Sequence, residues 1–402
     1  VQDVRRALED RNLDVLTIAT PNHWHSLMTV WAAQAGKHVY VEKPMSHNVK
    51  EGRIAVEMSR RHNVIVQHGT QSRSDARWAH ATALARSGQL GRVLVSRALC
   101  YKARNNDGGR VPNVNPATVP PEVDFNLWTG PAPLRPYHEN LVHYRWHWFW
   151  DFGNGDLGNQ GVHQMDIARW GIPNATMPRS AISLGGRYDS VVDRGETPNT
   201  QIAIFDFNPT QLIFEVRGLN TPAYRGQTVG NIFHCEAGDI VGNRQFYPRG
   251  STTPQPLPPL QRELERRPGG DDHFANFIAA VRSGRRTDLN ADVLEGHFSA
   301  ALCHLANVSY RLGENAAYVP RTRTLGDNRE AVETLERLEQ HLADNTLRLA
   351  NSDQSPLAHL TCRVGRKLDI DARTESITGN AEANRLLFRD YRAPFVVPER
   401  VG

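Results

Sequence analysis

The hydrophobic pattern at the start of the chain alternates between strand-like runs and helix-like repeats. Residues 13–20 form a short apolar, β-branched run that is typical of a strand buried on both faces. Residues 24–35 carry apolar side chains at helical spacing, and residues 37–42 are strand-like again. A second helix over 49–62 and a strand over 64–67 continue the alternation. This order predicts a parallel sheet with right-handed helical crossovers.

Beyond residue 88 strand-like segments follow one another. The side chains of residues 201–207 fall into two alternating sets, as expected in an antiparallel sheet. Further strands are predicted over 92–101, 181–184 and 211–216, and helices over 272–283 and 293–311. We therefore expect an α/β plus α+β protein, in which a partial Rossmann-type parallel sheet precedes an α+β domain with a large open antiparallel sheet.

Three parts are expected, because 402 residues exceed one ordinary domain. The parallel sheet occupies residues 1–72 and the antiparallel sheet residues 73–320, and residues 321–402 form a C-terminal extension. A charged amphipathic helix over 329–342 indicates that this extension is a solvated packing arm.

The composition narrows the classes of function. Hydrophobic residues make up 39% and charged residues 22%, which is typical of a soluble globular protein. The net charge of +4 comes without a run of Lys or Arg, so we expect no nucleic-acid partner, and no apolar stretch is long enough to span a membrane. The four cysteines lie far apart without a CxxC pair, which argues against a zinc site or a disulfide framework and favours core positions.

The chain begins with Val1 in a helix-like segment over residues 1–10. We interpret this as an N-terminal truncation, in which an export signal would not be visible. The compartment is therefore not determined; a cytoplasmic location is favoured, and an exported form stays open.

A first candidate site lies where the first two predicted strands end. The sequence ATPNHWH occupies residues 19–25, and Glu42, Lys43 and Pro44 follow the second strand. Open α/β sheets bind ligands at this edge, and Pro44 keeps Lys43 extended so that it projects into the crevice. A desolvated lysine beside a cationic nicotinamide ring has a lowered pKa and can accept a hydroxyl proton as hydride leaves. Glu-Lys-Pro is otherwise a common surface tripeptide, and only its position gives it weight.

A second candidate site is the glycine-rich segment over residues 153–166, which leads into a helix that stops after Trp170. Asn159 and His163 have i, i+4 spacing and share one face if the helix covers both. A core histidine on an amphipathic helix explains the same spacing.

The order of ATPNxxH, EKP, a GxxGxxGxH helix and an open antiparallel sheet resembles the Gfo/Idh/MocA oxidoreductases, from the first residues to about residue 320. The tail, with residues 381–384 and 391–394, is similar to members with a C-terminal extension. The resemblance implies that residues 1–72 are the remainder of a dinucleotide-binding Rossmann domain. It implies that residues 73–320 bind a carbohydrate substrate and form a homo-oligomer through the open sheet.

The resemblance also implies roles for individual residues. Lys43 should contact both nicotinamide and substrate, with His163 facing the substrate from the second domain. The residues expected to line the NAD or NADP cofactor are Thr20, Pro21, Asn22, His25, Glu42 and Lys43.

Two departures from the family pattern carry chemical consequences. The family has an acidic residue four positions before the histidine, whereas this chain has Asn159, which orients a hydroxyl but cannot take a proton. The missing negative charge should also leave the pKa of Lys43 lower. The family's GxGxxG phosphate-binding turn, which precedes this region, is absent, so we expect this chain to bind NAD(P) poorly.

Three further candidates stay open between a functional and a structural role. Trp148, in an aromatic segment, either stacks on the apolar face of a sugar or packs between the domains. Arg73 either faces the substrate or forms a salt bridge with a carboxylate. His143 and His147 have the spacing of metal ligands, but without a third ligand we expect no metal.

The function that follows is an NAD(P)-dependent oxidoreductase that moves a hydride between nicotinamide and a secondary hydroxyl of a sugar, cyclitol or glycoside. Lys43 acts as general acid and base, His163 assists, and Asn159 positions the substrate. Two alternatives are an NAD-retaining enzyme that cleaves or epimerises glycosides, and a catalytically degraded sugar-binding homologue. The sequence does not name the sugar or choose between NAD and NADP.

Overall fold

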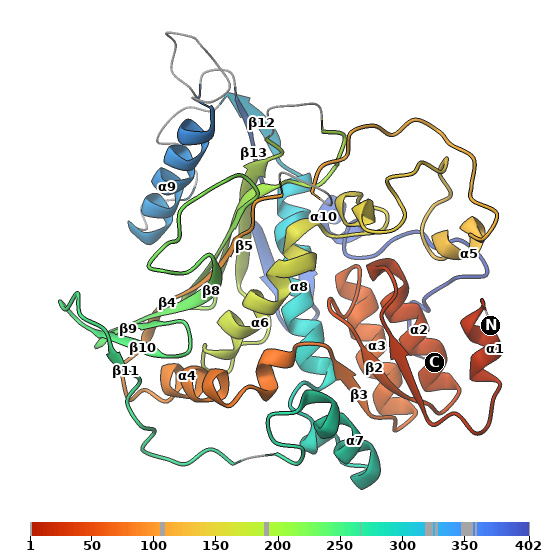
Figure 1. Ribbon diagram of the computed structural model, residues 1–402, viewed down its shortest axis with the longest axis horizontal. Coiled ribbons are helices and arrows are strands. Elements are labelled where there is room, and N and C mark those ends of the chain that lie inside the picture. Colours follow the sequence, from red (N-terminus) through yellow and green to blue (C-terminus); the bar gives the residue numbers. More distant parts are fainter. Residues whose placement is uncertain are drawn as a thin grey trace.

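The computed structural model describes residues 2–104, 109–188, 193–265, 267–317, 325, 329–346, 357 and 360–401. Two sheets pack against a central helix, α8 (Val293–Arg311), which runs between them in Figure 1. One side of α8 contributes Val293 and Ala300 to the core of the first unit, and Phe298 and Leu302 join the core of the second. The predicted boundary between residues 320 and 321 lies outside the described residues.

The first unit is a three-stranded parallel sheet in the order β1-β2-β3, with two crossover helices. Its elements are α1 (Val4–Leu8), β1 (Val15–Ile18), α2 (Asn22–Gln34), β2 (His38–Val41), α3 (Val49–Arg61) and β3 (Val66–His68). Val39, Val41 and Val66 are fully buried, in agreement with β-branched runs covered on both faces. The strands and crossover helices predicted here are confirmed, with bounds that differ by two residues or fewer.

The second unit is a sheet of twelve strands within the described residues, and it is antiparallel except where β4 runs parallel to β7. The strand order is β11-β10-β9-β8-β4-β7-β6-β5-β13-β12, with β14 pairing to β5 and β15 to β14. The strands are β4 (Val93–Tyr101), β5 (Ser180–Gly186), β6 (Thr200–Asp206), β7 (Gln211–Arg217), β8 (Val229–Cys235), β9 (Gly238–Val241), β10 (Gln245–Pro248), β11 (Gln255–Pro256), β12 (Glu314–Ala317), β13 (Thr361–Val364), β14 (Leu368–Asp371) and β15 (Ser376–Ile377). The predicted fold class is confirmed.

The interpretation of the C-terminal extension as a solvated arm is wrong. Its strands β13 and β14 pair with β5 and extend the large sheet. Further on, Phe395 is 2% exposed and packs edge-on against Trp24 of the first unit, with 5.4 Å between ring centroids. The pairing of β13 and β14 with β5 joins segments that lie far apart in the chain, so it is visible only in the folded chain.

The two faces of the large sheet are covered by different helices of the same chain. Alternate residues of β6 point to opposite sides: Phe205 packs with α6 (Val162–Trp170) and α8, whereas Ile204 packs with α9 (Arg329–Thr346). A buried ion pair between Arg97 and Glu215, 2.6 Å apart, lies under α9 and is joined by its Arg337. A second copy of the chain therefore cannot use this part of the open face, and homo-oligomerisation stays a prediction.

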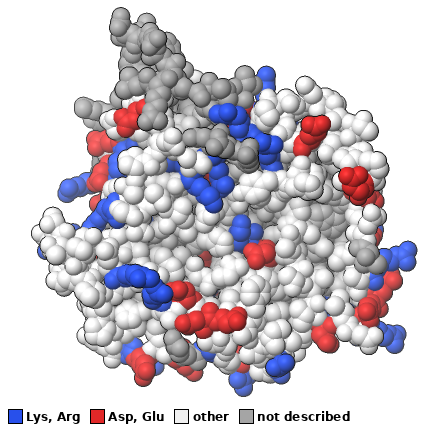
Figure 2. Space-filling model, in the orientation of Figure 1, with Lys and Arg blue, Asp and Glu red and all other residues white. Residues whose placement is uncertain are grey.

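The remaining helices surround the sheets (Figure 1). They are α4 (Ala76–Arg86), α5 (Phe125–Thr129), α7 (His273–Ser283) and α10 (Ala381–Arg385). No helix among the described residues has both the length and the apolar character needed to cross a bilayer. All four cysteines are free and buried, as predicted. Basic and acidic side chains are interspersed over the face seen in Figure 2.

Candidate functional site

Lys43 stands two residues beyond the end of β2 and reaches the glycine-rich segment of the second unit. Its Nζ donates hydrogen bonds to the main-chain oxygen of Asn159 at 3.1 Å and to Oδ1 of the same residue at 3.5 Å. The two candidate sites, 116 residues apart in sequence, are thus joined at one point.

The segment that carries Asn159 is a π-helical turn, Leu157–Gly161, that leads directly into α6. Single π-turns occur often at functional sites because they shift side chains out of the regular helical register. Glycine is required within this turn: a Cβ at Gly158 would lie 2.5 Å from the Asn154 side chain, and one at Gly161 would lie 2.7 Å from the Asp156 carbonyl oxygen.

His163 lies in the first turn of α6, near enough to Lys43 for the two to interact electrostatically. Burial lowers the pKa of the imidazole to about 4, and the positive charge of Lys43 contributes to the shift. The ring forms no hydrogen bond to the described part of the chain. At neutral pH it is therefore an uncharged ring whose nitrogens are available to a ligand.

The lysine itself is held in surroundings that disfavour its charge. Burial lowers the pKa of the Lys43 ammonium, and the carboxylate of Glu42 opposes that shift. The cations Lys102 and Arg104 lower the pKa further. A lysine whose pKa is lowered in this way exchanges a proton at lower pH than an ordinary surface lysine.

Tyr144 completes the polar cluster and was not selected from the sequence on its own. Its hydroxyl oxygen accepts hydrogen bonds from Asn159 Nδ2 at 2.9 Å and from Arg104 Nη1 at 3.2 Å. Arg104 is in turn paired with Asp156 at 2.5 Å. Because the phenol oxygen accepts twice, its own proton remains available to a ligand, and 40% of Tyr144 is exposed. The place of Asp156 in the glycine-rich segment was the only available signal for this group.

The predicted cofactor residues separate into two sets. His25 is buried, and its ring nitrogens lie 2.6 Å from the Pro44 oxygen and 2.8 Å from the Thr20 oxygen, so it ties together the loops after β1 and β2. Asn22 is also buried and donates to the Asn154 side chain at 3.3 Å. The residues that keep accessible surface at this edge are Thr20, Pro21, Glu42 and Lys43.

Arg73 and Trp148, which the sequence suggested as substrate-binding residues, are occupied by other parts of the chain. The Arg73 guanidinium forms a buried ion pair with Asp166 at 2.8 Å, which is the salt bridge that the sequence left open. Trp148 is 1% exposed, and Arg104 and Arg187 cover its ring, with distances of 5.4 and 5.8 Å to the centroid. A ring with no accessible face cannot stack on a sugar, and the Arg73 guanidinium is already paired with Asp166. Neither residue is therefore counted in the site.

The histidine pair with metal-ligand spacing also has a structural explanation. The His147 ring stacks on Trp146 with 3.6 Å between centroids, and its Nδ1 lies 2.6 Å from the Tyr144 carbonyl oxygen. Burial lowers its pKa to about 3. The described residues contain no group of three potential metal ligands.

Comparison with known families matches two segments of the chain. Residues 1–70 match the model described as oxidoreductase family, NAD-binding Rossmann fold. Residues 81–178 match the model described as oxidoreductase family, C-terminal alpha/beta domain. The two matches coincide with the parallel sheet and with the segment from α4 through α6.

Among similar proteins, the levoglucosan dehydrogenase of Pseudarthrobacter phenanthrenivorans is 32% identical over 258 residues, which is 60% of this chain and 58% of that protein. The scyllo-inositol 2-dehydrogenase (NAD(+)) of Bacillus subtilis is 32% identical over 111 residues, or 28% of this chain and 31% of that protein. The matches thus span less than two thirds of the length of these relatives.

Solved structures share the fold at low identity. The WlbA dehydrogenase from Bordetella pertussis, in complex with NADH and UDP-GlcNAcA, superposes with a TM-score of 0.55 at 20% identity, covering 77% of this chain and 80% of that one. Levoglucosan dehydrogenase in complex with NADH and levoglucosan gives 0.53 at 16% identity, covering 76% and 80%.

Proposed function

We propose an NAD(P)-dependent sugar-type dehydrogenase activity for this chain, whose residues 1–70 and 81–178 match the Rossmann-fold and C-terminal domain models of the Gfo/Idh/MocA oxidoreductases. The reaction transfers a hydride between nicotinamide and a secondary hydroxyl of a sugar, cyclitol or glycoside. The printed names of two relatives, a levoglucosan dehydrogenase and a scyllo-inositol 2-dehydrogenase, support this substrate class.

The observation that carries the proposal is the meeting of Lys43 with the Asn159–His163 segment. A basic side chain with a lowered pKa stands at the carboxyl edge of a parallel sheet, beside a neutral imidazole from the other unit. This edge is where open α/β sheets bind their ligands.

The residues at that edge are suited to the nicotinamide end of the cofactor. Thr20, Pro21 and Glu42 keep accessible surface next to Lys43, whereas Val39 and Val41 of the strand behind them are fully buried. Nicotinamide bound there supplies the acceptor for the substrate's hydride. The choice between NAD and NADP is left open by these residues.

Each side chain has a distinct role in oxidation of the substrate. Lys43, as a neutral amine, accepts the proton of the substrate hydroxyl while the hydride leaves the carbon and a carbonyl forms. Asn159 holds the lysine nitrogen in place through its two oxygens. His163, uncharged at neutral pH, hydrogen-bonds the reacting hydroxyl, and Tyr144 donates to a neighbouring sugar oxygen.

The test is a substrate panel with the protein as its gene encodes it, including levoglucosan and inositols, in which NADH absorbance is followed. Lys43→Ala should abolish turnover, whereas Lys50→Ala, an exposed lysine on α3, should leave it unchanged. Equal turnover in both variants would remove Lys43 from the mechanism. Product formation without net NADH would instead favour the NAD-retaining alternative, and sugar binding without any turnover would favour the degraded homologue.

A further inference from the structure

A large cavity in the described part of the chain lies away from Lys43 and His163. It has a volume of about 1310 Å³ and is lined by residues of α4, the end of α6, the start of α8 and the loop before α7. That volume exceeds the usual range for small-molecule sites, which is roughly 300–1,000 Å³. Nothing in the proposed dehydrogenase chemistry uses it.

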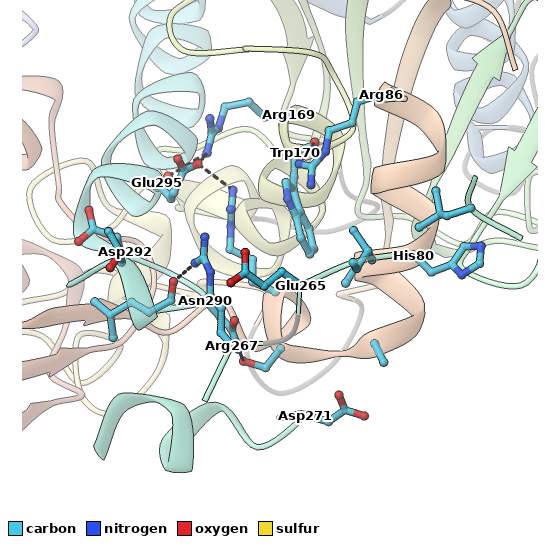
Figure 3. A pocket seen from close by; sticks show the side chains of 18 of the residues that line it. His80, Arg86, Arg169, Trp170, Glu265, Arg267, Asp271, Asn290, Asp292 and Glu295 are labelled. Carbon is cyan, nitrogen blue, oxygen red and sulfur yellow. Dashed lines mark hydrogen bonds and ion pairs between the residues drawn. The ribbon is translucent and has the colours of Figure 1, made fainter. Parts of the chain in front are cut away.

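Six arginines line this cavity, and four of them lie around Trp170 and Glu295; Figure 3 labels three of these four, Arg86, Arg169 and Arg267. The four are Arg73, Arg86, Arg169 and Arg267. Two carboxylates, Asp166 and Glu295, form ion pairs with Arg73 and Arg169. Arg73 pairs with Asp166 at 2.8 Å and with Glu295 at 3.1 Å, and Glu295 also pairs with Arg169.

Arg86 and Arg267 have no such partner within the part of the chain that the structure describes. Arg86 Nη1 donates to the main-chain oxygen of Trp170 at 3.2 Å, and Arg267 donates to the main-chain oxygen of Leu289. Their side chains remain accessible from the cavity. Desolvation lowers the pKa of both groups and the nearby charge of Arg73 lowers it further, whereas the carboxylate of Glu295 raises it. Within the described residues neither guanidinium forms a direct ion pair, so each can still pair with an added anion.

The indole of Trp170 fixes the direction of two of the guanidinium groups. Arg73 and Arg86 lie over its ring, at 5.1 and 5.6 Å from the centroid. A guanidinium stacked by its face keeps its N–H groups at the rim, and Arg86 uses one of its five for the bond to Trp170. Its remaining donors are free to bind an oxyanion in the forked geometry that carboxylate and phosphate accept.

The acidic residues of the cavity act on Arg86 and Arg267 only from a distance. Glu295 raises the pKa of both and Asp292 that of Arg267, but Asp292 is paired with Arg60 and Glu295 with Arg73 and Arg169. Glu263, Glu265 and Asp271 lie on the loop before α7. Figure 3 shows Glu265 beside Arg267, but no ion pair joins the two.

We propose that this cavity is a binding site for a small organic anion, held through its phosphate or carboxylate group by Arg86 and Arg267. The ligand is distinct from the sugar and the nicotinamide cofactor, because the cavity contains none of the residues of the Lys43 cluster. The cavity volume of about 1310 Å³ leaves room for the rest of such a molecule, and Trp170, Ile172 and Leu260 supply apolar surface in its lining.

The experiment is calorimetric titration with pyrophosphate and with citrate, at constant ionic strength and without sugar or nicotinamide cofactor. The unaltered protein should bind at least one of them saturably, and the stronger ligand identifies the phosphate or the carboxylate group. Arg86→Gln and Arg267→Gln should each weaken binding by roughly tenfold or more, because each removes charge-assisted hydrogen bonds. Arg92→Gln removes the same charge from an exposed pair with Glu236 outside the cavity and should change nothing.

Lys43→Ala separates this site from the proposed active site and should leave the titration unaltered. Loss of binding in that variant would place the anion in the Lys43 cluster and overturn the proposal. Equal affinities in Arg86→Gln, Arg267→Gln and Arg92→Gln, with native circular dichroism, would overturn it as well, as would the absence of binding by the unaltered protein at millimolar ligand.

Discussion

The first and second turns of helix α6 hold charged groups in opposite circumstances. At the first turn, His163 and the preceding Asn159 meet the Lys43 ammonium, whose hydrogen-bond partners there are amide oxygens. Three residues after His163, Asp166 is 1% exposed and forms a bidentate pair with Arg73, and Ser299 donates to it as well. One helix thus separates a cation without a direct ion pair from a cation in a buried ion pair.

The difference teaches what each turn does. A buried carboxylate with all its hydrogen bonds made fixes the position of three elements. A half-buried lysine held by amide oxygens has a lowered pKa and can exchange its proton. Chemistry is therefore expected at the first turn and rigidity at the second.

The largest effect is expected from Lys43→Arg, which keeps the cation but cannot release a proton near neutral pH. The loss in kcat/KM should be about 10²–10⁴-fold, the usual contribution of general acid–base catalysis. Steady-state kinetics check this, and the midpoint of urea unfolding should change little. A variant with near-native kcat/KM would show that the charge of Lys43 matters and its proton does not.

In the second turn of α6, Asp166→Asn removes the carboxylate that pairs with Arg73 inside the protein. Breaking a buried pair in this way costs about 3–5 kcal/mol, so the free energy of unfolding in urea should fall by that order. Glu236→Gln at the exposed pair with Arg92 should leave the free energy of unfolding nearly unchanged. Similar losses in the two variants would contradict the distinction between the buried and the exposed pair.

Asn159→Asp would place a carboxylate next to Lys43, so that this cation, like Arg73, would have a direct acidic partner. An opposite charge favours the ammonium, so the pKa of Lys43 should rise by about one unit. The rising limb of the pH–kcat/KM profile should then move to higher pH. Asn174→Asp adds the same charge on an exposed residue beyond the other end of the helix and should not move the profile. A shift of equal size in both would assign it to net charge alone.

The smallest effect concerns His163 and acid stability. Its pKa is about 4 in the folded chain against 6.5 for an ordinary histidine, so between these values the unfolded chain binds a proton that the folded chain does not. The contribution of the neutral His163 ring to the free energy of unfolding is therefore fully present above pH 6.5 and is lost as the pH falls towards 4. His163→Gln should reduce this loss by about 1 kcal/mol per pH unit, as measured by unfolding at several pH values. An unchanged slope would mean that the ring is not buried as described.

The fold of the first unit was accessible from sequence because its strands and crossover helices are local. Each element of β1 through β3 shows its own periodicity within a few residues, and the strand ends place Lys43 at the ligand-binding edge. The glycine-rich segment was also recognisable, because its spacing of glycines and of His163 is contained in one short stretch.

Partners far apart in the chain were decided only by the tertiary structure. Nothing in the local pattern pairs Tyr144 with Arg104, turns Arg73 towards Asp166, or places α9 across the face of the sheet. A periodic pattern says which face of an element is buried, but not which distant segment buries it. That choice depends on the packing of the whole chain, where contacts between remote residues must outweigh the entropy of closing the loops that separate them.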